Sequence, residues 1–140
     1  MSALRISKIE ALALAAPFAD LYDDPEDVPG WLRYPASSHR VLPRRGQYAT
    51  LVKVHAEDGT VGVGECYGLP APEVTATVVS AVLGPLLIGQ DALATTAVWE
   101  RLYQGQAAGG HNRGFYLEAM AGVDLALWDL RGNLAGQPVH

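Results

Sequence analysis

The alternation of apolar and polar positions divides the chain into a strand-forming first half and a helical second half. Apolar residues alternate imperfectly over residues 4–14, and Pro17 follows too soon for a stable helix, so a strand is predicted there. Alternation is clearest over residues 48–66, where two β-rich runs flank Asp58-Gly59. Because glycine tolerates the positive φ of a tight turn, these runs predict a hairpin and, with the first strand, a three-stranded antiparallel sheet.

Three helices are predicted after the sheet. The first begins at Pro72, since proline lacks the N–H that a first helical turn leaves unpaired, and we expect Gly84-Pro85 to end it. The second covers residues 93–104, where bulky side chains repeat at i, i+4. The third and strongest covers residues 115–135.

This last helix is apolar almost all round. On a helical wheel, a continuous polar strip is formed only by Glu118, Gly122, Asp129 and Asn133. Such a helix is buried on more than one side, so one side can pack on the sheet while the other requires a further partner. Gly136 is expected to cap the helix and Pro138 to bar its continuation. Because the chain stops at His140, directly after this terminator, we expect a chain cut off before a second domain.

The segment 17–46 shows no sustained periodicity. It holds five of the nine prolines and an acidic cluster, followed by aromatic and basic residues. A connection of this length is commonly functional or disordered, and its aromatic and basic residues favour a binding or lid loop. A second irregular stretch begins at Cys66 and ends at the Pro72 helix start.

Composition restricts the class of protein. With 140 residues, 49% of them hydrophobic and 18% charged, the chain is expected to fold as one globular domain. Its net charge of -5 disfavours nucleic-acid binding, and its single cysteine allows no internal disulfide. The N-terminus does not resemble a signal peptide, and no apolar stretch reaches the ~18 residues of a membrane span, so a soluble cytoplasmic protein is expected.

The sequence holds only weak motifs for a metal site, an anion site or a reactive thiol. The four histidines lack the spacing of a metal site, and the acidic cluster around residues 23–27 lacks the glycine of an EF-hand, so a solvated loop is the favoured interpretation. The glycine-rich residues 109–114 are interpreted as a helix-entry turn with Asn112 as N-cap, rather than as an anion cradle. Cys66 is expected to be an inert, small apolar residue.

Charged residues near the strands and on the last helix have structural interpretations. Glu65, at the end of a predicted strand, is expected to orient the adjoining loop, with a substrate role as the alternative. Asp124 and Arg131 project near each other within the apolar arc of the last helix, and a buried pair or a domain-interface contact is expected there, since a lone buried charge is costly.

Three stretches of the sequence carry a family resemblance. They are residues 61–66, residues 87–91 and residues 119–139, the last with its Ala126-Leu127-Trp128-Asp129 core and its Gly136-Gln137-Pro138 ending. With the order strand, long loop, hairpin, helices and long apolar helix, the chain resembles the N-terminal domain of the enolase superfamily. Within that superfamily it is most similar to the mandelate racemase/muconate lactonizing enzyme group.

The resemblance implies an α+β fold, a three-stranded antiparallel β-meander followed by a helical bundle, as one capping domain over residues 1–140. Its cap loops would be residues 17–46 and 66–72. In the family this domain covers a C-terminal (β/α)-barrel, whose strand ends hold the Mg²⁺ ligands and the bases that remove a proton α to a carboxylate. The barrel would be absent from this chain. We therefore expect no catalytic residue, metal ligand or cofactor here, with Mg²⁺ bound in the missing barrel.

The implied parent enzyme is a lyase or isomerase, such as an acid-sugar dehydratase or a racemase, and the complete enzyme is expected to be a homo-oligomer. Its partners would be the barrel and a small carboxylate substrate, which the polar and basic cap loops tilt towards acid sugars. Arg44 and Arg45 could pair with a carboxylate, while Trp31, His39 and Tyr67 could bind or shield a polar substrate. The alternative is that at least half of these residues face solvent or the barrel.

A function of a different class is also open. The chain could be a free-standing module that binds a partner or self-associates through the apolar helix at residues 115–135.

Overall fold

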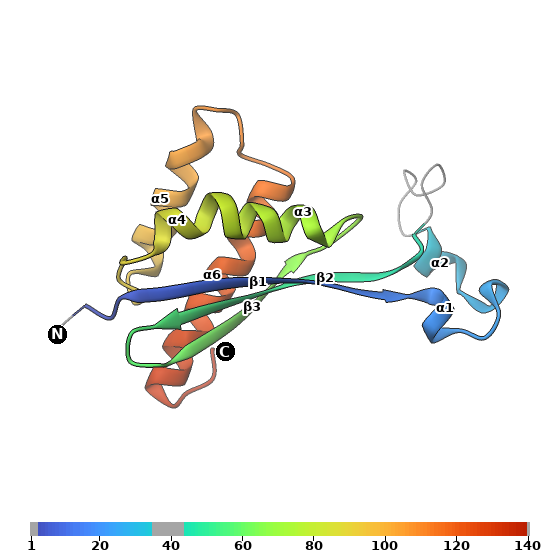
Figure 1. Cartoon of the computed structure of the whole chain (residues 1–140), viewed down its shortest axis with the longest axis horizontal. Coiled ribbons are helices and arrows are strands. Elements are labelled where there is room, and N and C mark those ends of the chain that lie inside the picture. Colours follow the sequence, from blue (N-terminus) through green and yellow to red (C-terminus); the bar gives the residue numbers. More distant parts are fainter. Residues whose placement is uncertain (1–2, 35–43, 140) are drawn as a thin grey trace.

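The computed structural model describes residues 3–34 and 44–139. A three-stranded antiparallel sheet in the order β1-β2-β3 carries helices on one face, and the longest helix crosses the strands steeply (Figure 1). The strands are β1 (Ile6–Pro17), β2 (Gly46–Ala56) and β3 (Val61–Tyr67). The predicted hairpin is confirmed, with Gly59 at φ +89° in its turn, while the first strand begins two residues later than predicted and continues to Pro17. The predicted α+β fold is confirmed.

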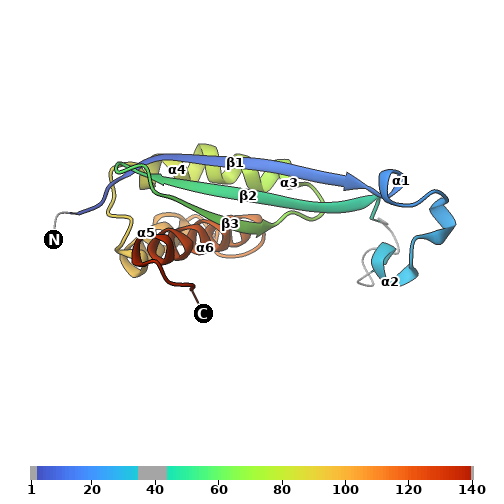
Figure 2. The ribbon, with the colours of Figure 1, turned by 90° about the horizontal axis from the view of Figure 1, so that it is seen from below.

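The helices follow the sheet in chain order. They are α3 (Pro72–Thr77), the π-helical η3 (Val78–Leu83), α4 (Gly84–Leu87), α5 (Thr95–Ala107) and α6 (Phe115–Ala135). The bounds of α6 agree with the prediction, and Gly136 caps it in the left-handed conformation. Figure 2 shows the helices stacked against the sheet in a second layer. The core between the layers includes Val52, Val54, Leu83, Met120 and Leu127, all fully buried.

The predicted helix end at Gly84-Pro85 is wrong, because α3, η3 and α4 run on without a break to Leu87. Proline in an α-helix interior clashes with the carbonyl four residues earlier. Here η3 widens the helix directly before Pro85, and the Gly84 N–H donates to the carbonyl of Val79, five residues back. The π-helical turn thus relieves the conflict that should have ended the helix.

Glycines set the distance between α6 and β3. A Cβ at Gly64 would lie 2.1 Å from the carbonyl oxygen of Gly122, and one at Gly122 would lie 2.2 Å from Sγ of Cys66. Backbone therefore packs directly on backbone at this crossing. The close approach explains why these positions carry no side chain.

The polar strip of α6 lies against the outer edge of β3. Oδ2 of Asp129 accepts a hydrogen bond from the Val63 N–H at 2.8 Å, and Nδ2 of Asn133 donates to the carbonyl of Val61 at 3.0 Å. The exposed part of α6 is mainly apolar, although Arg131 and Asn133 are exposed too. Its large side chains Leu125, Trp128 and Leu134 are 52%, 40% and 41% exposed.

The turn before α6 differs from the sequence interpretation. Asn112 was predicted as the N-cap, but the N-cap is Gly114, which has no side chain to accept a hydrogen bond. Its φ of +62° explains the preference for glycine at this position.

Candidate functional site

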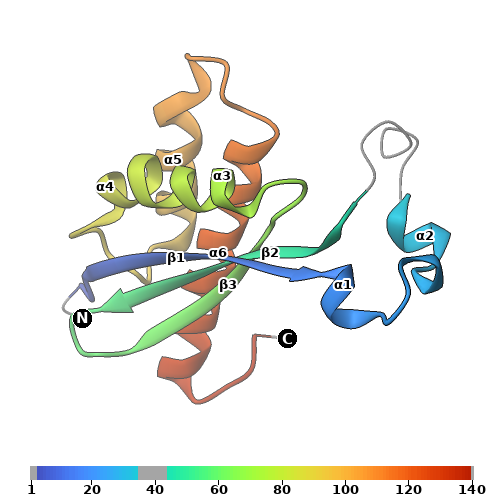
Figure 3. The same cartoon turned by 45° about the vertical axis from the view of Figure 1, so that its right-hand side comes forward.

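The strands β1 and β2 extend beyond the end of β3 and form a two-stranded arm. The last pair of β2 with β3 is Ala49 with Tyr67, whereas β1 and β2 remain paired as far as Pro17 and Gly46. The Phe18 N–H then donates to the carbonyl of Arg45 at 2.9 Å. Figure 3 shows the arm holding residues 18–34 away from the main helices. We call the described residues 18–34 and 44–45 the cap lobe.

The cap lobe has a small core of its own. Its elements are α1 (Phe18–Leu21), the 3-10 helix η1 (Pro25–Asp27) and α2 (Gly30–Arg33), each too short to leave a periodicity in the sequence. Phe18 and Val28 are buried, and the ring of Tyr22 meets that of Phe18 edge-on at 6.1 Å. The Asp24 carboxylate caps η1 by accepting from the Glu26 N–H at 2.8 Å.

A cavity of about 340 Å³ opens in the cap lobe. Phe18, Val28 and Tyr34 supply its apolar and aromatic wall, and Arg33, Arg44 and Arg45 supply its charge. None of these three arginines forms an ion pair with any residue that the structure describes. The cavity therefore combines an apolar wall with three unneutralised guanidinium groups, a combination that suits an organic anion.

Two of the arginines are positioned by hydrogen bonds. Arg33 donates from Nη2 to the carbonyl of Pro25, which fixes it across the lobe. Nη2 of Arg44 donates to Oε1 of Gln47 at 2.5 Å, and the Arg44 N–H donates to the Arg33 carbonyl at 3.2 Å. Nε of Arg44 is buried and has no partner among residues 3–34 and 44–139. A buried donor without an acceptor is costly, and an anion in the cavity could satisfy it.

The residues predicted to bind substrate are only partly brought together. Arg44 and Arg45 both line the cavity. Trp31 lies on α2 but outside the cavity and is 73% exposed, and Tyr67 lies at the end of β3 and is 57% exposed. His39 lies outside the described residues. Sequence reasoning missed Arg33, since its place in the cavity depends on the fold of α2 and no spacing marks it.

The irregular stretch expected over residues 66–72 is shorter than predicted, because β3 continues to Tyr67 and α3 begins at Pro72. Oγ1 of Thr50 donates to the Pro72 carbonyl at 2.8 Å, and the side chain of Leu69 is buried. These contacts anchor the loop to the sheet. Glu65, expected to orient this loop, is exposed on β3, and its side chain forms no hydrogen bond within the described part of the chain.

Cys66 is buried, as expected of an inert thiol. Its Sγ lies 3.8 Å from the carbonyl of Ala119, and burial raises the pKa of the thiol to about 11. Burial also raises the pKa of the nearby Glu118 carboxyl, whose Oε2 has no partner among the described residues. A protonated, buried thiol is a poor nucleophile, so this cluster has no feature of a catalytic centre.

The buried Asp124–Arg131 pair expected on α6 is not formed. Arg131 is exposed, and its guanidinium lies over the ring of Trp128, 5.3 Å from the ring centroid. Partial burial raises the pKa of Asp124. Arg131 therefore makes a cation–π contact with Trp128 in place of the expected pair with Asp124.

The described side chains do not form a metal centre. In the two described ranges, no three His, Cys, Asp or Glu side chains are grouped so that they could hold a metal ion. The residues that the structure describes therefore do not fit a Mg²⁺ site.

Comparison with known proteins decides the family. Residues 32–140 match the model of the mandelate racemase/muconate lactonizing enzyme N-terminal domain. The chain belongs to this family. The matched range includes Arg33, Arg44 and Arg45 of the cap lobe and the whole of α6.

Curated relatives in the family are much longer than this chain. It is 44% identical over 89 residues to D-galactarolactone cycloisomerase of Agrobacterium fabrum. This match covers 64% of the chain and 22% of the relative. It is 30% identical over 148 residues to L-rhamnonate dehydratase of Saccharopolyspora erythraea, covering 98% of the chain and 36% of the relative. The chain thus spans about a third or less of the length of these relatives.

Solved structures agree with the family and the fold. An enolase-superfamily member from Agrobacterium tumefaciens is 30% identical, with a TM-score of 0.75 over 99% of this chain and 37% of that one. A mandelate racemase/muconate lactonizing protein from Paracoccus denitrificans, complexed with magnesium, is 29% identical, with a TM-score of 0.70 over 97% of this chain and 29% of that one. Among the described residues, no helix is long and apolar enough to cross a membrane.

Proposed function

We propose that this chain, over residues 1–140, is the capping domain of an enolase-superfamily enzyme that acts on a sugar acid or a related carboxylate. The single observation that carries the proposal is the cap-lobe cavity, which three arginines and an apolar wall line and in which Nε of Arg44 is buried without an acceptor among residues 3–34 and 44–139. Relatives named for D-galactarolactone, L-rhamnonate and D-galactonate support this class of substrate.

In this proposal the cap lobe and the loop at residues 66–72 close over a substrate held by a barrel domain. Arg44 and Arg45 bind a carboxylate or hydroxyl group of the substrate, and Arg33 holds the cavity in shape through its hydrogen bond to Pro25. Trp31, His39 and Tyr67 complete the cover. Trp31 and Tyr67 are suited to this role because both present large exposed rings. The proton abstraction and the Mg²⁺ belong to the barrel, and this chain alone is without catalytic activity.

The barrel would pack against the exposed face of α6. That face has Leu125 and Trp128 exposed at 52% and 40%, beside Ala121 and Ala135, which are also exposed. Contiguous apolar surface of this kind marks an interaction site.

The same face supports a second candidate function, self-association of the free chain. This function predicts a concentration-dependent dimer in analytical ultracentrifugation. Substitution of Leu125 by Lys would then abolish the dimer and leave the cap-lobe cavity unchanged.

A domain exchange tests the capping function. The chain replaces the corresponding N-terminal region of the Agrobacterium fabrum cycloisomerase, and turnover of D-galactarolactone is measured. We expect an active chimera, and we expect R44A to raise KM by about tenfold, the effect of losing one charge-assisted contact of about 1.4 kcal/mol. R101A removes an exposed arginine on α5 and serves as the matched control. A folded chimera whose KM does not respond to R44A would refute the role of the cavity.

A further inference from the structure

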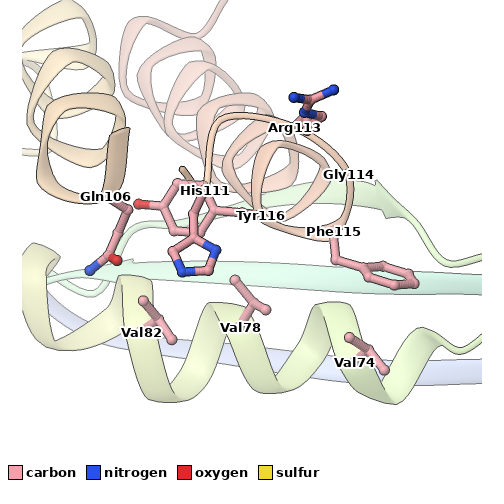
Figure 4. Close-up of a pocket in the computed structure, with 9 residues that line it drawn as sticks. All are labelled: Val74, Val78, Val82, Gln106, His111, Arg113, Gly114, Phe115 and Tyr116. Atoms are coloured by element: carbon pink, nitrogen blue, oxygen red, sulfur yellow. The ribbon is translucent and has the colours of Figure 1, made fainter. Parts of the chain in front are cut away.

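A second pocket lies between the α3–η3 helix and the turn that joins α5 to α6 (Figure 4), and it shares no lining residue with the cap-lobe cavity. Its volume is about 440 Å³. Val74, Val78 and Val82 form one wall, spaced by four along the helix, and Val74 and Val82 are 40% and 36% exposed. Exposed β-branched residues in a helix are unfavourable both for helix formation and for hydration. A ligand covering this valine row would remove the second cost.

The opposite wall is aromatic. Figure 4 shows the Phe115 ring over the Val74 end of the row, and His111 over the end formed by Val78 and Val82. Tyr116 closes the back of the pocket, and its hydroxyl donates to the Leu102 carbonyl at 2.6 Å. With that hydroxyl satisfied, Tyr116 offers the pocket only its ring. The interior therefore suits a flat aromatic or branched aliphatic group.

The polar groups gather at one end of the pocket. The imidazole of His111 and the amide of Gln106 both point towards the helix near Val82, while the Arg113 guanidinium lies on the outer side of the turn (Figure 4). The described residues that line the pocket include no carboxylate. The N-terminus of α6 at Gly114, which adds positive potential, lies at the opposite end of the pocket, beside Phe115 (Figure 4). With one arginine and no carboxylate among its described lining residues, the pocket as a whole is complementary to an anion.

The helix geometry is unusual where it meets the pocket. Val78 and Val82 belong to η3, the π-helical stretch that accommodates Pro85. Single π-helical turns within α-helices are frequent at functional sites.

From these features we infer that the pocket binds a small organic acid with an aromatic or branched aliphatic body. The body lies between the valine row and the ring of Phe115. The carboxylate accepts hydrogen bonds from the Gln106 amide and an imidazole N–H of His111, and Arg113 adds long-range attraction from the turn. This site is independent of the cap-lobe function proposed above.

Phenylacetate is the probe, and phenylacetamide, of nearly the same shape but without charge, is the matched ligand control. Titrations of the folded chain are followed by heteronuclear NMR, with thermal unfolding by circular dichroism as the check of folding. We expect saturable binding of phenylacetate that shifts the amide signals of residues 106–116. We expect at least about tenfold weaker binding of phenylacetamide, because it lacks the negative charge.

Paired variants locate the site. V82E places a carboxylate at the polar end and should weaken phenylacetate binding about tenfold relative to V82Q, which has the same size without the charge. H111A should weaken binding to a similar extent, and R101A on α5 should leave it unchanged. R44A should also leave it unchanged, which separates this site from the cap lobe. The inference is overturned by an absence of saturable binding up to about 10 mM, by equal affinity for the acid and the amide, or by equal affinities of V82E and V82Q.

Discussion

Substitution of Gly64 by alanine is the sharpest test of how α6 packs on the sheet. The new Cβ would lie 2.1 Å from the Gly122 carbonyl oxygen and 2.6 Å from the Ala126 nitrogen, both backbone atoms. Ordinary contacts begin near 3.4 Å, so helix and strand must separate by about 1.3 Å, the difference between 3.4 and 2.1 Å. That separation would loosen the buried contacts of Ala126 and Leu130, which are fully enclosed.

Overpacking of a core typically costs 1–3 kcal/mol, and a clash of backbone with backbone belongs at the upper end, so we expect G64A to destabilise the fold by about 3 kcal/mol. For a chain of this length that corresponds to a fall in Tm of roughly 10 °C. The assay is thermal and urea unfolding followed by circular dichroism.

G105A is the control of opposite sign. Gly105 lies inside α5, and a Cβ there meets only the Leu86 side chain at 3.8 Å. Alanine is a better helix former than glycine by about 1 kcal/mol, so G105A should stabilise the chain. If G64A unfolds within about 2 °C of the unsubstituted chain, taken as a stability change well under 1 kcal/mol, the close contact of α6 with β3 is not as described.

Three further predictions concern the surroundings of Cys66. G122A should cost less stability in a C66A background than in the parent chain, because a Cβ at Gly122 would lie only 2.2 Å from Sγ of Cys66. If the stability costs of the two substitutions are additive in a double-mutant cycle, this contact is contradicted. The native thiol should not react with a disulfide reagent at pH 8 and should react fully in denaturant, since its pKa is about 11; fast native labelling would count against its burial. Burial raises the pKa of the Glu118 carboxyl. As the pH rises from the ordinary carboxyl pKa through this raised pKa, Glu118 has to ionise in its buried position, and the folded chain loses stability. E118Q should therefore raise Tm at pH 7 but not in acid below that pH window. If the difference in Tm between E118Q and the parent chain is the same at both pH values, the raised pKa of Glu118 is refuted.

Sequence patterns predicted the regular elements well where local chemistry and tertiary packing agree. Asp58-Gly59 favours a tight turn wherever it lies between two strands, and the apolar positions over residues 115–135 favour a helix in any buried setting. Pro85 was misjudged because a proline ends an α-helix but not a helix that has widened into a π-helical turn. That outcome depends on contacts of η3 with the core, which no local pattern reveals.

The candidate site was predicted only in part for a similar reason. Arg44 and Arg45 were singled out because they lie in the segment that the family resemblance assigns to a cap loop, and because a guanidinium group matches a carboxylate. Arg33 was missed, and the sequence did not show that Trp31 lies outside the cavity, since α2 is a single turn of four residues. Elements of four residues carry no periodicity, so the direction of their side chains follows from tertiary contacts alone.

The hydrogen bonds from α6 to β3 also bear on how this fold avoids misassembly. An open strand edge offers unpaired N–H and C=O groups to which a strand of another chain can add, the first step of β-aggregation. Asp129 and Asn133 already occupy the Val63 N–H and the Val61 carbonyl, while the start of β1 is closed by the bond from the Ile6 N–H to the Gln90 carbonyl. Of the sheet edges within the described residues, the later part of β1 is therefore where an intruding strand would most readily add.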